Sequence, residues 1–248
     1  RLAAIDSLIF IYSRENIPVL RAKLFMDRAE ITRSVRDWTV AGDLHLQLLV
    51  LPDIPSSIKM YFYSKAETSY QEVIKLKPGD EATELKLAKV YVSMDGMQVM
   101  NGVQLLLGIL EKDSTNIDAY LLLAENGLRS GQFDKATGRV ESALNIRPRF
   151  AGQVMGLSEI GTLLSRIQYD QGQIAAADSM NAQLVQYVDR VRNMGISNDS
   201  LSRALDMMLV DVASVYLERQ DNSVMQGIQI LLKETEAKPD NYPAQLEL

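Results

Sequence analysis

One segment, IDAYLLLAENGLRSGQFDKATGRVESALNIRPR at Ile117–Arg149, decides the fold class. Apolar residues in its first half recur at spacings of three and four, the period of an amphipathic helix. A turn signal at Ser130-Gly131-Gln132 interrupts this pattern, and a second apolar stripe with the same period follows. Pro148 then ends the second stripe, because proline cannot continue a helix. The segment predicts two short helices, and the small residues Ala124 and Ala136 would let their axes approach closely.

Related patterns recur along most of the chain. Three of the seven prolines, Pro78, Pro148 and Pro239, each follow a helical apolar pattern and a basic residue. The interval from Pro78 to Pro148 is 70 residues, which is twice 35, and the interval from Pro148 to Pro239 is 91 residues. The longer interval suggests two such periods plus a long insertion. A regular period near 35 residues is typical of stacked helical repeats, and we count five to six helix pairs.

The deciding segment resembles a tetratricopeptide repeat (TPR). Nine positions carry this resemblance: Tyr120, Leu123, Ala124, Gly127, Gly131, Ala136, Val140, Ala143 and Pro148. Gly127 replaces the Tyr-like residue of the family pattern, and we expect it to loosen that helix interface. The resemblance implies an all-α fold, a right-handed α-α superhelix (TPR solenoid) of about five to six helix pairs.

We divide the chain into four parts on these patterns. They are degenerate N-terminal repeat helices at 1–50, a central TPR array at 51–189 with an insertion at 51–56, a linker at 190–200, and a C-terminal TPR unit at 201–248 with the start of a further repeat. A solenoid that stops inside a repeat lacks its polar cap, so we expect the chain to continue or that end to be covered.

The insertion interrupts an otherwise repeat-like stretch. Trp38 and His45 occupy packing positions of a repeat, but Pro52 and Pro55 then forbid a continuous helix. We expect the next helix to restart with an N-cap at Ser56-Ser57 and to run towards Lys77. The alternative is an irregular loop built for contact.

Composition excludes several classes of function. Lys and Arg total 26 and Asp and Glu total 32, so the formal charge is −6, whereas non-specific nucleic-acid binding needs a basic surface. The chain has no Cys, which excludes disulfides and Cys-based metal or catalytic sites. No apolar run reaches the ~20 residues that span a bilayer. Because the sequence starts at Arg1 and not at Met, we expect a processed protein or a fragment, and this start leaves open whether a signal or anchor was removed.

No enzymatic motif is present, so we expect no catalytic activity and neither a cofactor nor a metal. His45 is the single histidine, and its packing position indicates a structural role. We interpret the carboxylate pairs Asp6/Glu15 and Glu234/Glu236 as solvated faces. The 11 methionines are expected mainly in the core, including those at 94, 97, 100, 207 and 208.

The TPR resemblance implies that first helices of the repeats line a groove for an extended or helical peptide. On this pattern the candidate partner-binding residues are Lys89, Leu121, Glu125, Arg129, Arg166 and Tyr169. Their separated cations suit a partner with acidic character. Leu121 and Glu125 stand where the chaperone-binding subset of the family has the Lys and Asn of a two-carboxylate clamp, so we exclude that subset.

The leading hypothesis is a non-catalytic protein-protein interaction scaffold or adaptor that binds a protein or peptide partner through the groove. A bacterial envelope-associated complex is the favoured setting, periplasmic or membrane-anchored in preference to cytoplasmic. One alternative is a homo-oligomeric assembly module, since open repeat ends favour self-association. A weaker alternative is a regulatory subunit of an enzyme or a small-ligand binder.

Overall fold

The computed structural model describes residues 1–94, 96–195, 198–219, 221–239 and 242–246, which contain helices and no strand. The all-α prediction is therefore confirmed. The helices are α1 (Leu2–Arg14), α2 (Pro18–Thr32), α3 (Val35–Leu48), α4 (Ser56–Leu76), α5 (Glu81–Ser93), α6 (Met97–Lys112), α7 (Ile117–Arg129), α8 (Phe133–Leu144), α9 (Ala151–Asp170), α10 (Ile174–Asn193), α11 (Asp199–Leu217), α12 (Val224–Ala237) and α13 (Tyr242–Leu246).

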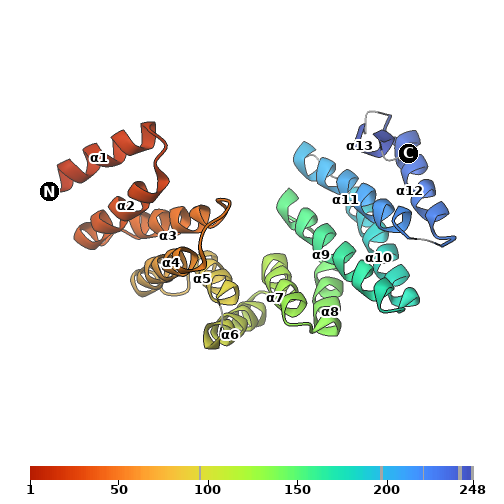
Figure 1. Ribbon diagram of the computed structural model, residues 1–248, viewed down its shortest axis with the longest axis horizontal. Coiled ribbons are helices and arrows are strands. Elements are labelled where there is room, and N and C mark those ends of the chain that lie inside the picture. Colours follow the sequence, from red (N-terminus) through yellow and green to blue (C-terminus); the bar gives the residue numbers. More distant parts are fainter. Residues whose placement is uncertain (95, 196–197, 220, 240–241, 247–248) are drawn as a thin grey trace. The chain divides into compact units, whose positions relative to one another are not determined.

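The chain forms two compact units, Arg1–Ser114 (unit 1) and Thr115–Leu248 (unit 2). In unit 1 the helix pairs are α1/α2, α3/α4 and α5/α6, and each pair also packs against the next. In unit 2 the pairs are α7/α8, α9/α10 and α11/α12, and α11 also packs extensively on α9 (Figure 1). The described residues thus form six helix pairs and one further short helix, as the repeat pattern predicted. The four-part division of the chain stays a prediction.

The turn inside the deciding segment recurs one pair later. After α7, Gly131 adopts a φ of +70° and the Gln132 N–H donates to the Gly127 carbonyl at 2.8 Å. After α9, Gly172 has a φ of +76°, and the Gln173 N–H donates at 2.8 Å to the carbonyl five residues before it. This is the glycine-ended helix stop in which a left-handed residue lets the next amide cap the last carbonyls. The same glycine-ended turn therefore connects α7 to α8 and α9 to α10.

Gly127 tightens its helix interface, which corrects our expectation that it would loosen it. A Cβ on Gly127 would lie 3.1 Å from the Ala136 Cβ and 3.3 Å from the Gln132 carbonyl oxygen. Ala136 and Ala124 are both fully buried. The missing side chain therefore allows α8 to approach α7 closely, where a tyrosine would hold the helices apart.

The insertion after α3 has the predicted position but a different cap. Trp38 and His45 lie buried in α3, and α4 begins at Ser56 after the two prolines. Pro55 is the N-cap residue and no side chain caps α4, so the expected Ser56-Ser57 cap is wrong. The start of the insertion is apolar and open to solvent, since Leu51 is 50% exposed.

The long interval between Pro148 and Pro239 arises mainly from longer helices, which corrects our expectation of a long insertion. Helices α9 and α10 have 20 residues each and α11 has 19, whereas α7 and α8 have 13 and 12. Within the range 190–200, α10 continues to Asn193 and α11 begins at Asp199. Residues 196–197 of the predicted linker lie outside the described residues, and so do Asp95 and Gln220, near which the repeat pattern also predicts turns.

An ion network fixes the last helices of unit 2 and corrects our interpretation of Glu234 as a solvated residue. The Glu234 side chain on α12 is 2% exposed and accepts two hydrogen bonds from Arg192 on α10, at 2.8 and 2.9 Å. Arg192 also donates to Asp206 on α11 at 2.6 Å, and Lys238 pairs with the same carboxylate. The network thus joins three helices through one guanidinium.

We expect Glu234→Gln to lower the free energy of unfolding by roughly 2–4 kcal/mol, because it removes the charge opposite a half-buried guanidinium. The cost stays below that of a fully buried pair, since Arg192 is 25% exposed and keeps Asp206. The matched control is Glu236→Gln, an exposed carboxylate two residues along the same helix. Chemical denaturation measures both variants, and equal midpoints would contradict the role of the network.

His45 lies inside the α3–α4 interface, as its repeat position predicted. Its side chain is buried, its Nδ1 lies 2.7 Å from the Ala41 carbonyl oxygen, and its ring is 6.1 Å from that of Phe62. Burial lowers the pKa of His45, and the hydrogen bond to Ala41 opposes part of that shift. The ring therefore packs as a neutral core group.

This lowered pKa predicts a pH dependence of stability. The unfolded chain takes up a proton on His45 near pH 6.5, whereas the folded chain resists it. The stabilisation is therefore complete above pH 6.5 and is lost as pH falls below it, by at most about 1.4 kcal/mol per pH unit. Since the chain has one histidine, denaturation midpoints between pH 7 and 5 report on this group. His45→Asn should flatten the profile in that window, and an unchanged slope would exclude His45 as its origin.

Candidate interaction surface

Two pockets lie along the seam where α11 packs beside α9 in unit 2, and we call this seam the α9–α11 groove. The larger pocket has a volume of about 520 Å³ and lies between the N-terminal halves of the two helices. Its lining includes Met155, Ser158, Glu159, Arg203, Met207 and Asp211. The smaller, of about 200 Å³, lies between the C-terminal ends, where Arg166, Tyr169, Glu218 and Arg219 line it.

Polar contacts across the seam hold the groove in shape. The Ser158 hydroxyl on α9 donates to the Asp211 carboxylate on α11 at 2.7 Å. Further along α9, towards its C-terminal end, the Arg166 guanidinium donates two hydrogen bonds to Glu218, at 2.7 and 3.0 Å. Because both contacts join the same two helices, the register of α9 and α11 is set at two points.

Arg219 lines the smaller pocket of the groove, at the C-terminal ends of α9 and α11. Its guanidinium lies between the rings of Tyr169 and Tyr216, 4.6 and 4.7 Å from their centroids, and pairs with Asp178 on α10. Cation–π contacts of this kind gain strength when they are desolvated, and the Arg219 side chain is 2% exposed. Burial also raises the pKa of Tyr216. This arrangement is structural, because the guanidinium already has an ion-pair partner and two aromatic rings as neighbours.

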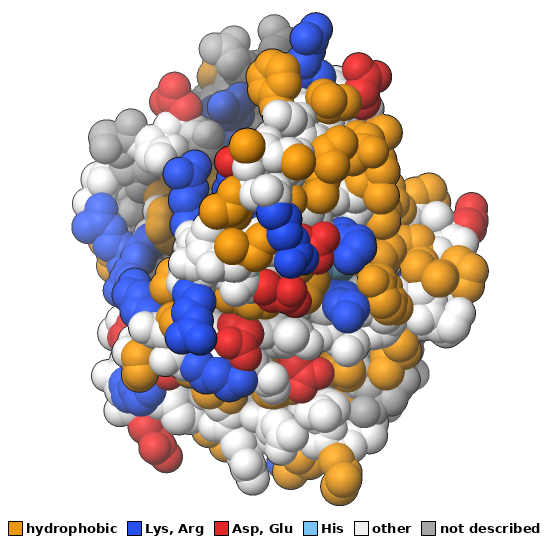
Figure 2. Space-filling model, turned by 90° about the vertical axis from the view of Figure 1, so that its left-hand side faces the viewer, with side chains coloured by type: hydrophobic (Ala, Val, Ile, Leu, Met, Phe, Trp, Pro, Cys, Tyr) orange, Lys and Arg blue, Asp and Glu red, His pale blue; other side chains and the backbone are white. Residues whose placement is uncertain are grey.

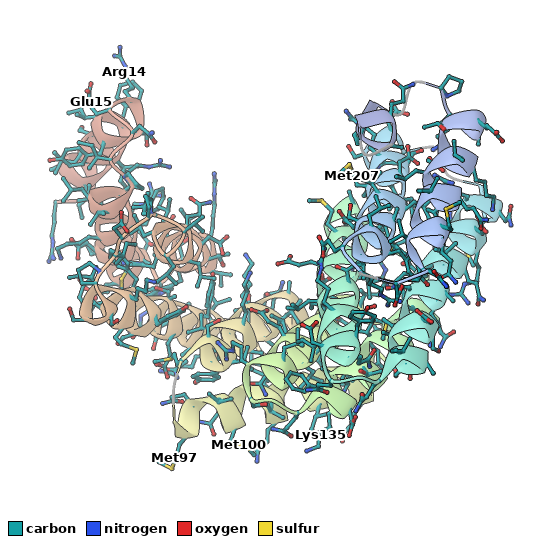
Figure 3. All side chains as sticks on the ribbon, turned by 45° about the vertical axis from the view of Figure 1, so that its right-hand side comes forward. Arg14, Glu15, Met97, Met100, Lys135 and Met207 are labelled. Atoms are coloured by element: carbon teal, nitrogen blue, oxygen red, sulfur yellow. The ribbon has the colours of Figure 1, made fainter. Side chains whose placement is uncertain are left out.

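The open part of the groove combines apolar and charged side chains. Met155 is 60% exposed and Met207 40%, and Glu159 and Arg203 are exposed beside them. Figure 3 labels Met207 on α11. The groove holds no nucleophile paired with a histidine, and the described residues contain no group of His, Asp and Glu side chains able to hold a metal ion.

The structure brings two of the predicted partner-binding residues together. Arg166 and Tyr169 share the smaller pocket, but Arg166 is engaged by Glu218, and the Tyr169 hydroxyl donates to Asp221 at 3.1 Å. A partner would have to compete with these contacts.

The other predicted residues lie on different helices. Leu121 on α7 is half-buried at the α7–α9 contact, since a Cβ on Gly156 would lie 2.8 Å from its Cδ1. Glu125 and Arg129 are exposed further along α7, and Lys89 is exposed on α5 in unit 1. Their partner-binding role stays a prediction.

Sequence reasoning missed the residues that line the larger pocket. Met155 and Glu159 are four residues apart, and so are Arg203, Met207 and Asp211, so each set forms one stripe on its helix. This signal was available, but on α9 the repeat pattern selected Arg166 and Tyr169, which lie in the C-terminal half of that helix. The larger pocket instead begins at the N-terminal turns of α9 and α11, two helices that are longer than α7.

The methionines divide between core and surface, which corrects our expectation that these five lie mainly in the core. Met94 and Met208 are buried. Met97 is 88% exposed and Met100 59%, and both project from α6 (Figure 3). With Met207 in the groove, three of the five methionines singled out by sequence reach solvent.

No helix among the described residues has the length and apolar character to cross a membrane.

No family model and no curated protein matches the sequence. Solved structures do match. A double mutant of MamA (RS-1 ArsTM) has a TM-score of 0.51 at 14% identity and covers 78% of this chain and 97% of its own. A crystal structure of MamA has a TM-score of 0.42 at 16% identity, with coverages of 77% and 99%. The P58(IPK) TPR domain has a TM-score of 0.24 at 14% identity, with coverages of 99% and 86%.

These likenesses concern the fold alone, since all identities are below 25%. The likeness to the MamA double mutant, with its TM-score of 0.51, agrees with what the chain itself contains: paired helices, glycine-ended turns and the nine TPR-pattern positions of Tyr120–Pro148. The protein is an all-α solenoid with the fold of tetratricopeptide-repeat proteins.

Proposed function

We propose that this protein is a non-catalytic scaffold that binds a protein or peptide partner in the α9–α11 groove. The observation that carries the proposal is the 520 Å³ pocket between two neighbouring first helices, with Met155 and Met207 exposed in it. Exposed methionine is adaptable and polarisable, which suits contact with varied apolar side chains. The TPR-type fold supports an interaction role in general.

The charges around the pocket support recognition of an extended segment. Glu159 and Asp211 present carboxylates, and Arg203 presents a cation one turn from Met207. Such charges orient a partner and set its register more than they add raw affinity, whereas desolvated apolar contacts supply most of the binding energy. The methionines are therefore the side chains whose loss should weaken binding most.

We expect the double variant Met155→Asp/Met207→Asp to reduce partner capture at least about tenfold, because each change buries a charge at the contact. The matched control is Met225→Asp, an exposed methionine (56%) on α12 outside the groove. The measurement is affinity capture from an extract of the source organism, quantified by mass spectrometry, with circular dichroism as the folding control.

A photo-cross-linking residue at position 207, compared with one at 225, identifies the contact directly. Cross-links to the same captured protein at position 207 alone would support the groove. Undiminished capture by the folded double variant would place the binding site elsewhere.

Self-association is the second candidate, and an exposed apolar surface on α1 and α2 favours it. Phe10 is 63% exposed, Ile11 48% and Val19 45%. Figure 2 looks onto this side of unit 1, where hydrophobic side chains gather beside basic ones. Light scattering on the purified chain separates the two candidates: a homo-oligomer that Phe10→Asp converts to a monomer would favour assembly. The envelope setting and the regulatory or ligand-binding role stay predictions.

A further inference from the structure

A second pocket of unit 2 has a lining distinct from that of the α9–α11 groove. It has a volume of about 630 Å³, and its walls come from the connections that precede α7, α9 and α11. The α8–α9 connection contributes Ile146, Arg147 and Arg149, and the α10–α11 connection contributes Gly195 and Asn198. The pocket therefore sits where consecutive helix pairs follow one another, at their connecting turns.

This pocket is cationic in an acidic protein. Arg147 and Arg149 are exposed, and neither forms an ion pair with any residue that the structure describes. Nearby, Arg190 donates to the Leu144 carbonyl, a neutral acceptor, so its charge is not cancelled. The chain as a whole carries a formal charge of −6. Guanidinium groups left without a carboxylate partner attract one from outside.

The backbone that carries the arginines is held in place. The buried Gln153 side chain accepts the Arg149 N–H at 2.8 Å and donates to the Asp118 carboxylate at 2.8 Å. Asp118 also lines a smaller pocket of about 50 Å³ with Arg147 and Arg149, and because the Gln153 amide is neutral, the Asp118 charge offsets one of these two cations. On the opposite wall, the Asn198 side chain caps α11 by accepting the Leu201 N–H at 3.1 Å. Pre-organised walls lower the ordering cost of binding a ligand.

The pocket also has an apolar part. Pro148 and Leu201 are buried beneath it and Ile146 is half-buried beside the two arginines. A small oxyanion would meet the guanidinium groups but leave most of a 630 Å³ space and its apolar surface in water. An acidic peptide, with carboxylates for the arginines and an apolar side chain between them, fits both features.

We propose that this pocket binds an acidic segment of a protein partner, with its carboxylates on Arg147 and Arg149 and an apolar side chain against Ile146 and Leu201. The proposal rests on the proposed function in that the ligand is a protein segment. The site proposed in this subsection differs from the site of the proposed function, because this pocket and the α9–α11 groove have different lining residues.

The test uses an array of synthetic peptides that share one apolar residue and contain graded numbers of Glu, with Gln in place of Glu as the neutral series. Binding of the full chain should rise with the number of Glu residues and fall as salt is raised. Arg147→Glu/Arg149→Glu should reduce binding of the most acidic peptide at least about tenfold. Arg147→Lys/Arg149→Lys keeps the charge but loses the bidentate geometry, so we expect a smaller loss.

The matched control is Lys135→Glu/Arg139→Glu, which changes the net charge equally on α8 without touching the pocket. It should retain acidic-peptide binding, and circular dichroism checks the folding of every variant. Equal binding of the Glu and Gln series, equal losses in the control, or full displacement of the peptide by inorganic phosphate at the same concentration would each overturn the proposal.

The groove variant Met155→Asp/Met207→Asp separates the two proposals on the same array. It should leave the dependence on Glu unchanged if the pocket acts as proposed. Loss of acidic-peptide binding in the groove variant, with retention in the arginine variant, would assign the acidic ligand to the groove and refute the pocket while the proposed function stands.

Discussion

Close approach of paired helices is the constraint on which the rest of the structure depends. Five of the six described pairs have a glycine at the seam where an added Cβ would lie 2.6 to 3.1 Å from the partner helix: Gly42, Gly102, Gly127, Gly161 and Gly227. The tightest backbone contact is that of Gly227 with the Ala213 carbonyl oxygen, at 2.7 Å. Dense interiors lose stability when such seams are overpacked, because neighbouring atoms have no space into which to move.

In unit 2, charged groups fix how successive helix pairs stack on one another. Arg192 joins α10 to α11 and α12, whereas Arg219 joins the end of α11 to α9 and α10. Both guanidinium groups are largely removed from water and each has carboxylate or aromatic partners. Buried ion pairs of this kind add little net stability but tolerate few alternative arrangements, since a misplaced partner leaves a buried charge unpaired.

The two candidate binding sites lie on different parts of the stacked helix pairs. The α9–α11 groove is a surface of neighbouring first helices, extended because these helices are longer than α7. The arginine pocket lies at the connections between pairs, and its lining includes Arg147 and Arg149 but no carboxylate. One ligand segment would thus meet methionines and mixed charges on the helices, and another would meet cations at the turns.

The sequence alone was sufficient to predict the helix pairs, the turn at Gly131 and the burial of Ala124, Ala136 and His45. These features depend on local periodicity and on residues with restricted backbone conformations, which act within a few positions of the chain. Tertiary structure alone decided that Gly127 tightens its seam, that Glu234 is buried, that Arg166 is paired with Glu218, and that Met155 and Met207 line one groove. Each of these depends on which residues from distant segments come into contact, and helix length and packing, not local pattern, determine those contacts.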